Sequence, residues 1–387
     1  MEKVALLRCE DYDVKLIEDK LREGFDFLGG DKFLKELIPY NKKVLLKPNM
    51  LSVEEAGSPV VTNFNVFEAV IRIIKDYTNN ISFGDSPGFG DSRKAAERSG
   101  LLSVAQKYNV KFEDFKESIH VKLDKSILCK SWTVAKAPYE ADVLITLPKI
   151  KTHAMAYYTG AIKNQFGCVP GSLKATWHTR MPSANNFCKM LLDLNTLVNT
   201  NFAILDGIIG MEGNGPKSGN PKKMNTLIMG KSLSAVDSTA VRLIGYDNPL
   251  DIPLLKEVYD QKWGEVLPKN IEVLGQRIED MKVSDFQLCR KAGSFYFISP
   301  AVTNFLRDLI APDPSLIKEK CIGCGRCKEV CPEKSRVIKM VKDKDKNIPT
   351  WNMKECIRCF CCQELCPCGA IELKYSALGK ILKMNKR

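Results

Sequence analysis

The sequence contains no apolar stretch long enough to cross a lipid bilayer. A membrane-spanning helix needs about 18 or more consecutive apolar residues, and no run of that length occurs. The apolar segment near the start is short, and charge returns at Arg8 and Glu10, whereas a secretory signal peptide has a longer apolar core. We therefore expect no membrane span, no membrane partner and no secretion.

Two common cofactor and partner signatures are also missing. The Gly-x-Gly-x-x-Gly loop that holds the pyrophosphate of a dinucleotide is absent, so we predict no NAD or FAD site of the Rossmann type. Basic residues are numerous, but they are not interleaved with aromatic residues and form no known nucleic-acid-binding motif. We therefore predict no nucleic-acid partner.

Cysteine, in contrast, is abundant, and two matching runs of four stand out among the 15 cysteines. Each run has the spacing C-x2-C-x2-C-x3-C-P, which holds iron–sulfur clusters, and the second run repeats the first at a constant offset. The first three cysteines of such a run bind one cluster, and the fourth turns away to bind the other. We therefore predict two 4Fe–4S clusters, the first held by Cys321, Cys324, Cys327 and Cys366, and the second by Cys356, Cys359, Cys362 and Cys331.

The alternatives to iron–sulfur binding are a zinc site and a disulfide framework. Zinc sites usually pair two C-x2-C hooks, and the third hook of each run has no use in a tetrahedral site. Two matched runs of four cysteines therefore favour clusters. Because clusters and free thiols both suit a reducing interior, we expect a cytoplasmic location in an oxygen-poor cell.

Residues 313–375 resemble the bacterial-type two-cluster ferredoxins. An isoleucine follows the first cysteine of each run, and the segment 366–371 matches the usual ending of that family. The first run departs from this ending at 331–337, after its last cysteine, so the predicted ligands are intact. Cys361 and Cys368 have no place in the pattern. We interpret them as spare thiols near a cluster, with a ligand exchange as the alternative.

The net charge of +12 is concentrated in the part of the chain that carries the cysteine runs. Residues 316–387 hold 17 Lys and Arg against 8 Asp and Glu, whereas residues 1–315 hold 41 against 38. A basic surface around anionic clusters would attract an acidic electron carrier. We therefore predict ferredoxin or flavodoxin as a partner, with a merely solubilising surface as the alternative.

Apolar strands alternate with amphipathic helices before the cysteine runs. Short apolar runs predict strands at 4–7, 44–46, 81–83, 143–147, 202–205 and 226–229. Helical periodicity predicts helices at 13–28, 64–77, 92–108, 187–198 and within 235–260. The alternation predicts an α/β fold, with a mostly parallel sheet flanked by helices, ahead of a small C-terminal α+β ferredoxin-like domain. We place the α/β domain at 1–300, a linker at 301–315, the ferredoxin domain at 316–375 and a basic tail at 376–387.

Polar and glycine-rich segments follow several of these strands. They lie at 47–49, 84–88, 148–153 and 206–207. Parallel strands gather their carboxyl ends at one edge of the sheet, and ligands bind there in such folds. We therefore predict a shared crevice that binds a small anionic ligand, such as a phosphate or carboxylate, with contributions from Lys47, Asn49, Asp85, Lys149 and Lys163.

Side chains at this crevice are candidates for chemistry. A desolvated lysine can act as an acid, a base or a Schiff-base nucleophile, and a histidine can transfer protons or bind a metal. The alternatives are solvated lysines and structural histidines. The candidate catalytic residues are Lys149, His153, Lys163 and Asp85, and the candidate ligand-binding residues are Lys47, Asn49, Gly84, Ser86, Gly88, Asn164 and Asp206. Further candidates are Lys151, His178, Glu212, Asp237, Gln165 and the thiol of Cys168.

The loop 84–88 has two interpretations. Its glycines would let backbone N–H groups approach a phosphate or carboxylate. The same Gly-Asp-Ser-Pro-Gly composition is typical of a tight turn, so both alternatives stay open.

Several short segments of the first 250 residues together resemble the domain of unknown function 362 family, which is often fused to ferredoxin domains. The segments are Leu46-Lys-Pro-Asn49, Gly84-Asp-Ser-Pro-Gly88, Leu147-Pro-Lys-Ile-Lys-Thr-His153, Thr159-Gly-Ala-Ile-Lys-Asn-Gln-Phe-Gly167, Asp206-Gly207, Met211-Glu-Gly-Asn-Gly-Pro216 and Ser234-Ala-Val-Asp237. The resemblance implies the domain arrangement and no particular activity.

These observations predict an iron–sulfur oxidoreductase. Electrons would pass from a ferredoxin-like carrier through two clusters to an anionic substrate or cofactor in the crevice. One alternative is a non-enzymatic electron carrier or docking protein. Another is a redox-neutral lyase or isomerase with structural clusters, which a similarity to lactate racemase-like folds suggests.

Overall fold

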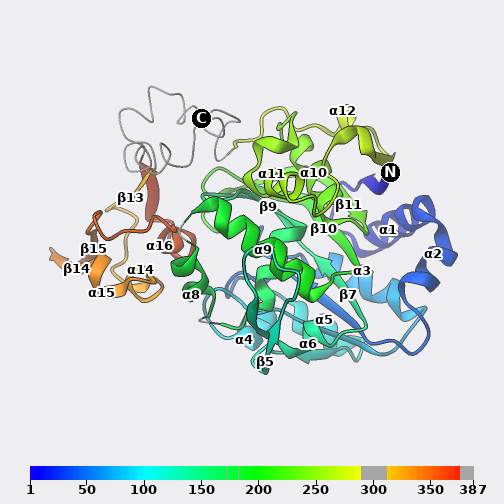
Figure 1. The fold of residues 1–387 in the computed structure, drawn as a ribbon, viewed down its shortest axis with the longest axis horizontal. Coiled ribbons are helices and arrows are strands. Elements are labelled where there is room, and N and C mark those ends of the chain that lie inside the picture. Colours follow the sequence, from blue (N-terminus) through cyan, green and yellow to red (C-terminus); the bar gives the residue numbers. More distant parts are fainter. Residues whose placement is uncertain (172, 182, 289–311, 375–387) are drawn as a thin grey trace.

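The computed structural model describes residues 1–171, 173–181, 183–288 and 312–374. Figure 1 shows two parts, a large one built from residues 1–288 and a small one built from residues 312–374. We name them the α/β domain and the cluster domain. The boundaries that we placed at 300, 315 and 375 stay predictions, because residues 289–311 and 375–387 lie outside the described residues.

The α/β domain is built on a ten-stranded sheet, which confirms the predicted fold class. Along the main path the order is β12 (Ile271–Gly275), β1 (Glu2–Arg8), β11 (Asn220–Gly230), β10 (Phe202–Glu212), β7 (Val143–Leu147), β2 (Val44–Pro48), β3 (Ile81–Gly84) and β4 (Lys111–Glu113). All pairings on this path are parallel except those of β11 with its two neighbours. The carboxyl ends of β2, β3, β7 and β10 therefore lie at one edge of the sheet.

Helices cover both faces of this sheet, as its parallel strands require. One apolar core lies under α1 (Val14–Leu28), α2 (Gly30–Leu37), α3 (Phe64–Lys75), α4 (Ser92–Arg98) and α5 (Leu101–Lys107). The other lies under α7 (Ala161–Asn164), α9 (Ala184–Val198), α10 (Leu233–Leu243), α11 (Pro253–Asp260) and α12 (Ile278–Met281). The short helices α6 (Lys136–Tyr139) and α8 (Leu173–Arg180) lie on the second face.

Helix α9 illustrates how the sequence specifies these elements. Ser183 caps its N-terminus by accepting a hydrogen bond from the N–H of Asn186, and Asn199 ends it in a left-handed conformation, with φ of 42°. Phe187, Leu191 and neighbouring apolar residues face the core. The predicted periodicity over 187–198 is therefore confirmed, and the cap extends the helix to residue 184.

Some elements differ from the prediction. The helix expected at 92–108 is two helices, because Gly100 adopts a left-handed φ of 80° between α4 and α5. The polar segment expected after β7 forms strand β8 (Lys149–His153), which pairs with β10 and with β9 (Tyr157–Thr159). An antiparallel hairpin of β5 (Ser118–Lys122) and β6 (Ser131–Ala135) was not expected.

Strand β10 is the largest correction. We expected it to stop at Leu205, with a turn at 206–207, but it continues to Glu212 and pairs with β11 on both sides of an irregularity between Gly207 and Ile209. A bulge of this kind bends the strand without ending it. Asp206 is therefore a strand residue, held next to Lys149 of β8.

The cluster domain has an internal repeat that follows the repeat in its sequence. Two antiparallel pairs enclose it, β13 (Asp313–Leu316) with β16 (Ile371–Lys374) and β14 (Ile338–Asp343) with β15 (Lys346–Trp351). The short helices are α14 (Arg326–Glu329), α15 (Lys334–Val337) and α16 (Cys361–Glu364). Helices α14 and α16 occupy equivalent positions of the two cysteine runs.

The repeat extends to the backbone conformation ahead of these helices. Gly323 and Gly325 have φ of 72°, and the equivalent Arg358 and Phe360 have φ of 53° and 61°. Glycine adopts this left-handed conformation at little cost, whereas arginine and phenylalanine require support from their surroundings. Phe360 has that support, because its ring is buried in a core of the α/β domain.

Candidate iron–sulfur centres and polar crevice

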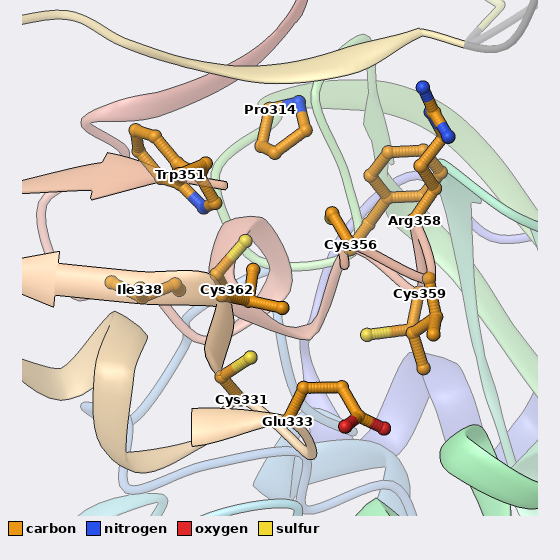
Figure 2. Close-up of a pocket in the computed structure, with 12 residues that line it drawn as sticks. Pro314, Cys331, Glu333, Ile338, Trp351, Cys356, Arg358, Cys359 and Cys362 are labelled. Atoms are coloured by element: carbon orange, nitrogen blue, oxygen red, sulfur yellow. The ribbon is translucent and has the colours of Figure 1, made fainter. Parts of the chain in front are cut away.

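Four cysteines from both runs line one cavity of the cluster domain (Figure 2). They are Cys331, Cys356, Cys359 and Cys362, the set that we predicted for one cluster. Apolar side chains complete the wall, among them Pro314, Val337, Ile338 and Trp351. Cys331 comes from the first run, so the fold carries it across to the other three, as the crossed ligation requires.

A second cavity is lined by the other predicted set. Cys321, Cys324, Cys327 and Cys366 surround it, together with Leu316, Met340, Pro349 and Ile371. Cys368 also lines this cavity, and its sulfur lies 3.7 Å from the sulfur of Cys366. Cys361 lies elsewhere, with its thiol hydrogen-bonded to that of Cys359.

Both cavities fit an iron–sulfur cluster in the chemistry of their walls. Each offers four thiol sulfurs in an apolar setting, the donor set that holds a 4Fe–4S cluster. The indole Nε1 of Trp351 is buried beside the first cavity and faces the sulfur of Cys362, where a cluster-bound thiolate would accept its proton. Among the described residues, no three His, Cys, Asp or Glu side chains converge as closely as a single ion requires. Ligation by these eight cysteines stays a prediction.

Several of the polar side chains that we expected at the strand ends are joined by hydrogen bonds around the half-buried side chain of Asn49. The Asn49 side-chain amide donates to Asn164 Oδ1 at 2.9 Å, and its oxygen accepts from Lys151 Nζ at 2.6 Å. Asn164 in turn donates to Thr146 Oγ1 and to the carbonyl of Lys47. Residues from β2, β7, β8 and α7 are therefore joined at the edge of the sheet where the sequence places the crevice.

Lys47 has a fixed counter-charge. Its ammonium lies 2.7 Å from Asp85 Oδ1, both side chains are buried, and Asp85 also accepts from the N–H of Met50 at 2.7 Å. Gly167 packs against this ion pair so closely that a Cβ atom there would collide with Asp85. Buried ion pairs are stable only with such additional hydrogen bonds and tight packing.

Lys149 also has a fixed counter-charge, the carboxylate of Asp206. Both side chains contact Tyr12, a residue that the sequence analysis missed. The Lys149 ammonium donates to Asp206 Oδ2 at 2.8 Å and to the Tyr12 hydroxyl at 2.6 Å. Tyr12 donates to Asp206 Oδ1 and accepts from the N–H of Ile209 at the bulge of β10. Burial lowers the pKa of Lys149, and Asp206 partly offsets this effect. A lone tyrosine far away in the sequence carries no signal of this role.

Lys151 has no carboxylate partner among the described residues. Its ammonium donates to Asn49 Oδ1 and to the carbonyl of Val60 at 2.7 Å. Burial, together with the charges of Lys163 and Lys149, lowers its pKa to about 7. Lys149, Lys151 and Lys163 therefore lie within electrostatic range of one another.

The polar groups of the loop at 84–88, which begins at the last residue of β3, bond to neighbouring segments of the α/β domain. The N–H groups of Ser86 and Gly88 donate to the carbonyls of Gly167 and Leu51. The Ser86 hydroxyl accepts from the buried ammonium of Lys174, which also donates to the carbonyl of Val169. Anion binding by Gly84, Ser86 and Gly88 stays a prediction, and it would require these contacts to open.

The cluster domain contacts the end of β8, the strand that carries Lys149 and Lys151, through α16 (Figure 1). His153 Nε2, at the end of β8, lies 2.9 Å from Glu364 Oε1, although the two atoms are not aligned for a full hydrogen bond. Beside this contact, Gln363 donates to Asn214 Oδ1 at 2.6 Å. Both α16 residues are buried although they lie in a short helix of a small domain, because the α/β domain covers them.

Glu364 carries a negative charge among basic groups. Burial alone would raise its pKa, but attraction by His153, Lys163 and His178 outweighs burial and lowers the pKa to about 2. Burial lowers the pKa of Lys163, which Glu364 partly offsets. Burial also lowers the pKa of His178 to about 4. His153, His178 and Lys163 therefore gather at one end of the crevice, facing the cluster domain.

Other candidates have structural roles or lie elsewhere. Asp237 accepts from the N–H groups of Ala161 and Ile162 and from Tyr158, so it caps α7. Glu212 accepts from the N–H of Gln287. Burial raises the pKa of the Cys168 thiol to about 12, which leaves it a poor nucleophile. Gln165 is buried beside Cys168 and accepts from its thiol.

The fold and the two cysteine-lined cavities define an α/β protein with an iron–sulfur domain, and comparison with known proteins supports this class. Residues 44–242 match the family model described as "Domain of unknown function (DUF362)", and residues 313–367 match a "4Fe-4S dicluster domain". The chain belongs to the DUF362 family, because that model matches more than half of it. It is an iron–sulfur protein by its second domain.

A relative and two solved structures are similar to parts of the chain. Thylakoid-associated protein sll1697 from Synechocystis sp. (strain ATCC 27184 / PCC 6803 / Kazusa) is 33% identical over 256 residues, which are 66% of this chain and 78% of that protein. The lactate racemase apoprotein from Thermoanaerobacterium thermosaccharolyticum has a TM-score of 0.39 at 13% identity, and the match covers 60% of this chain and 54% of the racemase chain. A Thermotoga maritima protein has a TM-score of 0.33 at 11% identity, over 56% of this chain and 55% of its own. This chain thus spans about half the length of each solved structure.

In the part of the chain that the structure describes, no helix combines the length and apolar character that a bilayer span needs. The cytoplasmic location stays a prediction.

Proposed function

We propose that this protein is an iron–sulfur oxidoreductase whose acceptor site is the polar crevice of the α/β domain. One observation carries the proposal. The cysteine run that contains Cys359 and Cys362 is packed against the crevice through α16, so one cluster cavity adjoins the buried lysines and histidines. The clusters, when bound, supply one-electron transfer. The residues of the crevice bind and orient the acceptor and hold its protons.

The two cysteine runs differ in what surrounds them, which supports a direction from solvent to crevice. In the first run Cys324 is exposed, Ile322 is 65% exposed, and Lys328 and Glu329 face solvent. At the positions equivalent to Lys328 and Glu329 in the second run, Gln363 and Glu364 are buried against the α/β domain. One cavity therefore lies near solvent, where a carrier could reach it, and the other lies near the crevice.

An acidic carrier such as ferredoxin or flavodoxin suits the exposed side. The lysines at 318, 320, 328, 339 and 342 are exposed in the cluster domain, and a positive surface attracts an acidic partner before contact. The rate of cluster reduction by such a carrier should fall as ionic strength rises, because salt screens the attraction. A rate that is independent of salt would exclude this mode of docking.

The function is tested by substrate-dependent reoxidation. Protein with both clusters reduced under anaerobic conditions is mixed with small anionic compounds, and the cluster absorbance is followed. We expect one class of anion to speed reoxidation in wild-type protein and to have no effect in Lys163→Met, which loses one positive charge of the crevice but no cluster cysteine. Fast reduction by the carrier with no anion-dependent reoxidation would contradict an enzyme and favour an electron carrier.

A further inference from the structure

A carboxylate of the cluster domain lies inside the α/β domain. Glu364 is only 7% exposed, and the basic groups around it come from β8, α7 and α8. Its counterpart in the first cysteine run, Glu329 on α14, is exposed. A glutamate at this position of a cysteine run can therefore remain in solvent. The burial of Glu364 is explained instead by the basic groups of the crevice, which attract its carboxylate.

The source of its counter-charge separates Lys163 from Lys47 and Lys149. Lys47 and Lys149 are balanced by Asp85 and Asp206, which belong to the same domain as these lysines. Within the described residues, the side chain of Lys163 makes no hydrogen bond or ion pair, and the carboxylate that attracts it most strongly is Glu364. Its charge is thus balanced by an element that does not belong to the α/β domain.

The two histidines add neutral donors to this site. Nδ1 of His153 accepts from the N–H groups of Met155 and Ala156, so the ring proton is on Nε2, which faces Glu364. Among the described residues, Nδ1 of His178 is buried without a hydrogen-bond partner, and His153 Nε2 has only the poorly aligned contact with Glu364 Oε1 at 2.9 Å. Buried polar atoms normally have partners, so the two ring nitrogens remain available to a carboxylate that is placed better than that of Glu364.

We propose that Lys163, His153 and His178 form a binding site for a small carboxylate ligand, and that Glu364 occupies this site until the ligand displaces it. The inference rests on the proposed function, which makes the crevice the acceptor site. One ammonium and two imidazoles match the single charge of a carboxylate, whereas a phosphate dianion would leave a buried charge uncompensated. The ligand carboxylate would take the place of Glu364, next to the cavity of Cys359.

The test measures binding of radiolabelled acetate to the full chain by equilibrium dialysis under anaerobic conditions, with the clusters reconstituted. Glu364→Ala removes the competing carboxylate and leaves room for acetate. We expect about one acetate per chain and an affinity at least about tenfold above that of wild type, the size of a lost charge-assisted contact. Acetamide, which is similar in size but uncharged, should not compete.

Two controls make the outcome specific. Glu329→Ala removes the equivalent glutamate of the first run and should bind acetate like wild type. Lys163→Met combined with Glu364→Ala should lose the gain. The proposal is overturned if Glu364→Ala binds acetate no better than wild type, or if the double variant keeps the gain.

If cluster absorbance shows that Glu364→Ala does not fold, Glu364→Gln keeps the size, removes the charge and should also bind acetate more tightly. Since acetate binding requires no electron transfer, this result is independent of whether reoxidation by a substrate is found.

Discussion

Gly167 is the residue on which the Lys47–Asp85 ion pair depends. An alanine Cβ at this position would collide with Asp85 Oδ1 and lie 2.7 Å from Lys47 Nζ. Gly167→Ala should therefore separate a buried ion pair and lower the free energy of unfolding by about 2–4 kcal/mol. Urea unfolding measures the change.

Gly88→Ala is the matched control for that substitution. Its Cβ would make ordinary contacts, 3.5 Å from Leu365 at the nearest, so the free energy of unfolding should stay within about 0.5 kcal/mol of wild type. Equal losses in the two variants would mean that the packing around the ion pair is not what makes Gly167 necessary.

Cys331 tests the crossed arrangement of the cluster ligands. It belongs to the first run but lines the cavity of Cys356, Cys359 and Cys362. In wild type we expect about eight irons and eight acid-labile sulfides per chain, and in Cys331→Ala about four of each. The remaining paramagnetic signal should be the one that Cys356→Ala retains, whereas Cys188→Ala, which alters a buried cysteine of α9, should keep both clusters. A signal that matches the one lost in Cys356→Ala would disprove the crossing.

At the scale of elements, most strands of the main sheet could be predicted because their apolar runs are continuous. Val44–Pro48 and Val143–Leu147 are buried over their whole length. Strand β8 could not be predicted, because Lys149, Lys151 and His153 suggest a polar loop. These side chains are buried only because Asp206, Asn49 and the cluster domain supply partners, which a local pattern does not show.

Part of the candidate site could also be predicted from the sequence. The rule that parallel strands gather their ends at one edge places Lys47, Asn49 and Lys149 in one region, and their hydrogen-bond network lies there. The contact of His153 with Glu364 joins residues from different domains, and no spacing in the sequence indicates it. Tyr12 was missed for the same reason.

Phe360 tests how α16 is held against the α/β domain. Its ring is buried in the larger core although its backbone φ is positive. Phe360→Ala should weaken the packing of the two domains by about 3 kcal/mol. Small-angle X-ray scattering should then report a larger radius of gyration with both clusters still bound.

Ile322→Ala is the control for the same domain, because Ile322 is 65% exposed and supports no interface. Its radius of gyration should equal that of wild type. An unchanged radius in Phe360→Ala would mean that other contacts, such as that of Gln363 with Asn214, are sufficient to hold the domains together.

At the scale of the whole molecule, the central claim is that one iron–sulfur centre and the crevice form a single site. The ammonium of Lys163 interacts electrostatically with both Glu364 and the thiol of Cys361. Its charge should therefore affect the nearby centre much more than the distant one, since electrostatic interaction weakens with distance and with solvent screening.

The most direct measurement is a potentiometric titration followed by electron paramagnetic resonance, comparing wild type with Lys163→Met and with Lys15→Met, which alters an exposed lysine of α1. Loss of the positive charge should lower the reduction potential of one centre by on the order of tens of millivolts. The account predicts that this centre is the one lost in Cys356→Ala, with the other unchanged and with no shift in Lys15→Met. Equal potentials in wild type and Lys163→Met, or equal shifts of both centres, would contradict it.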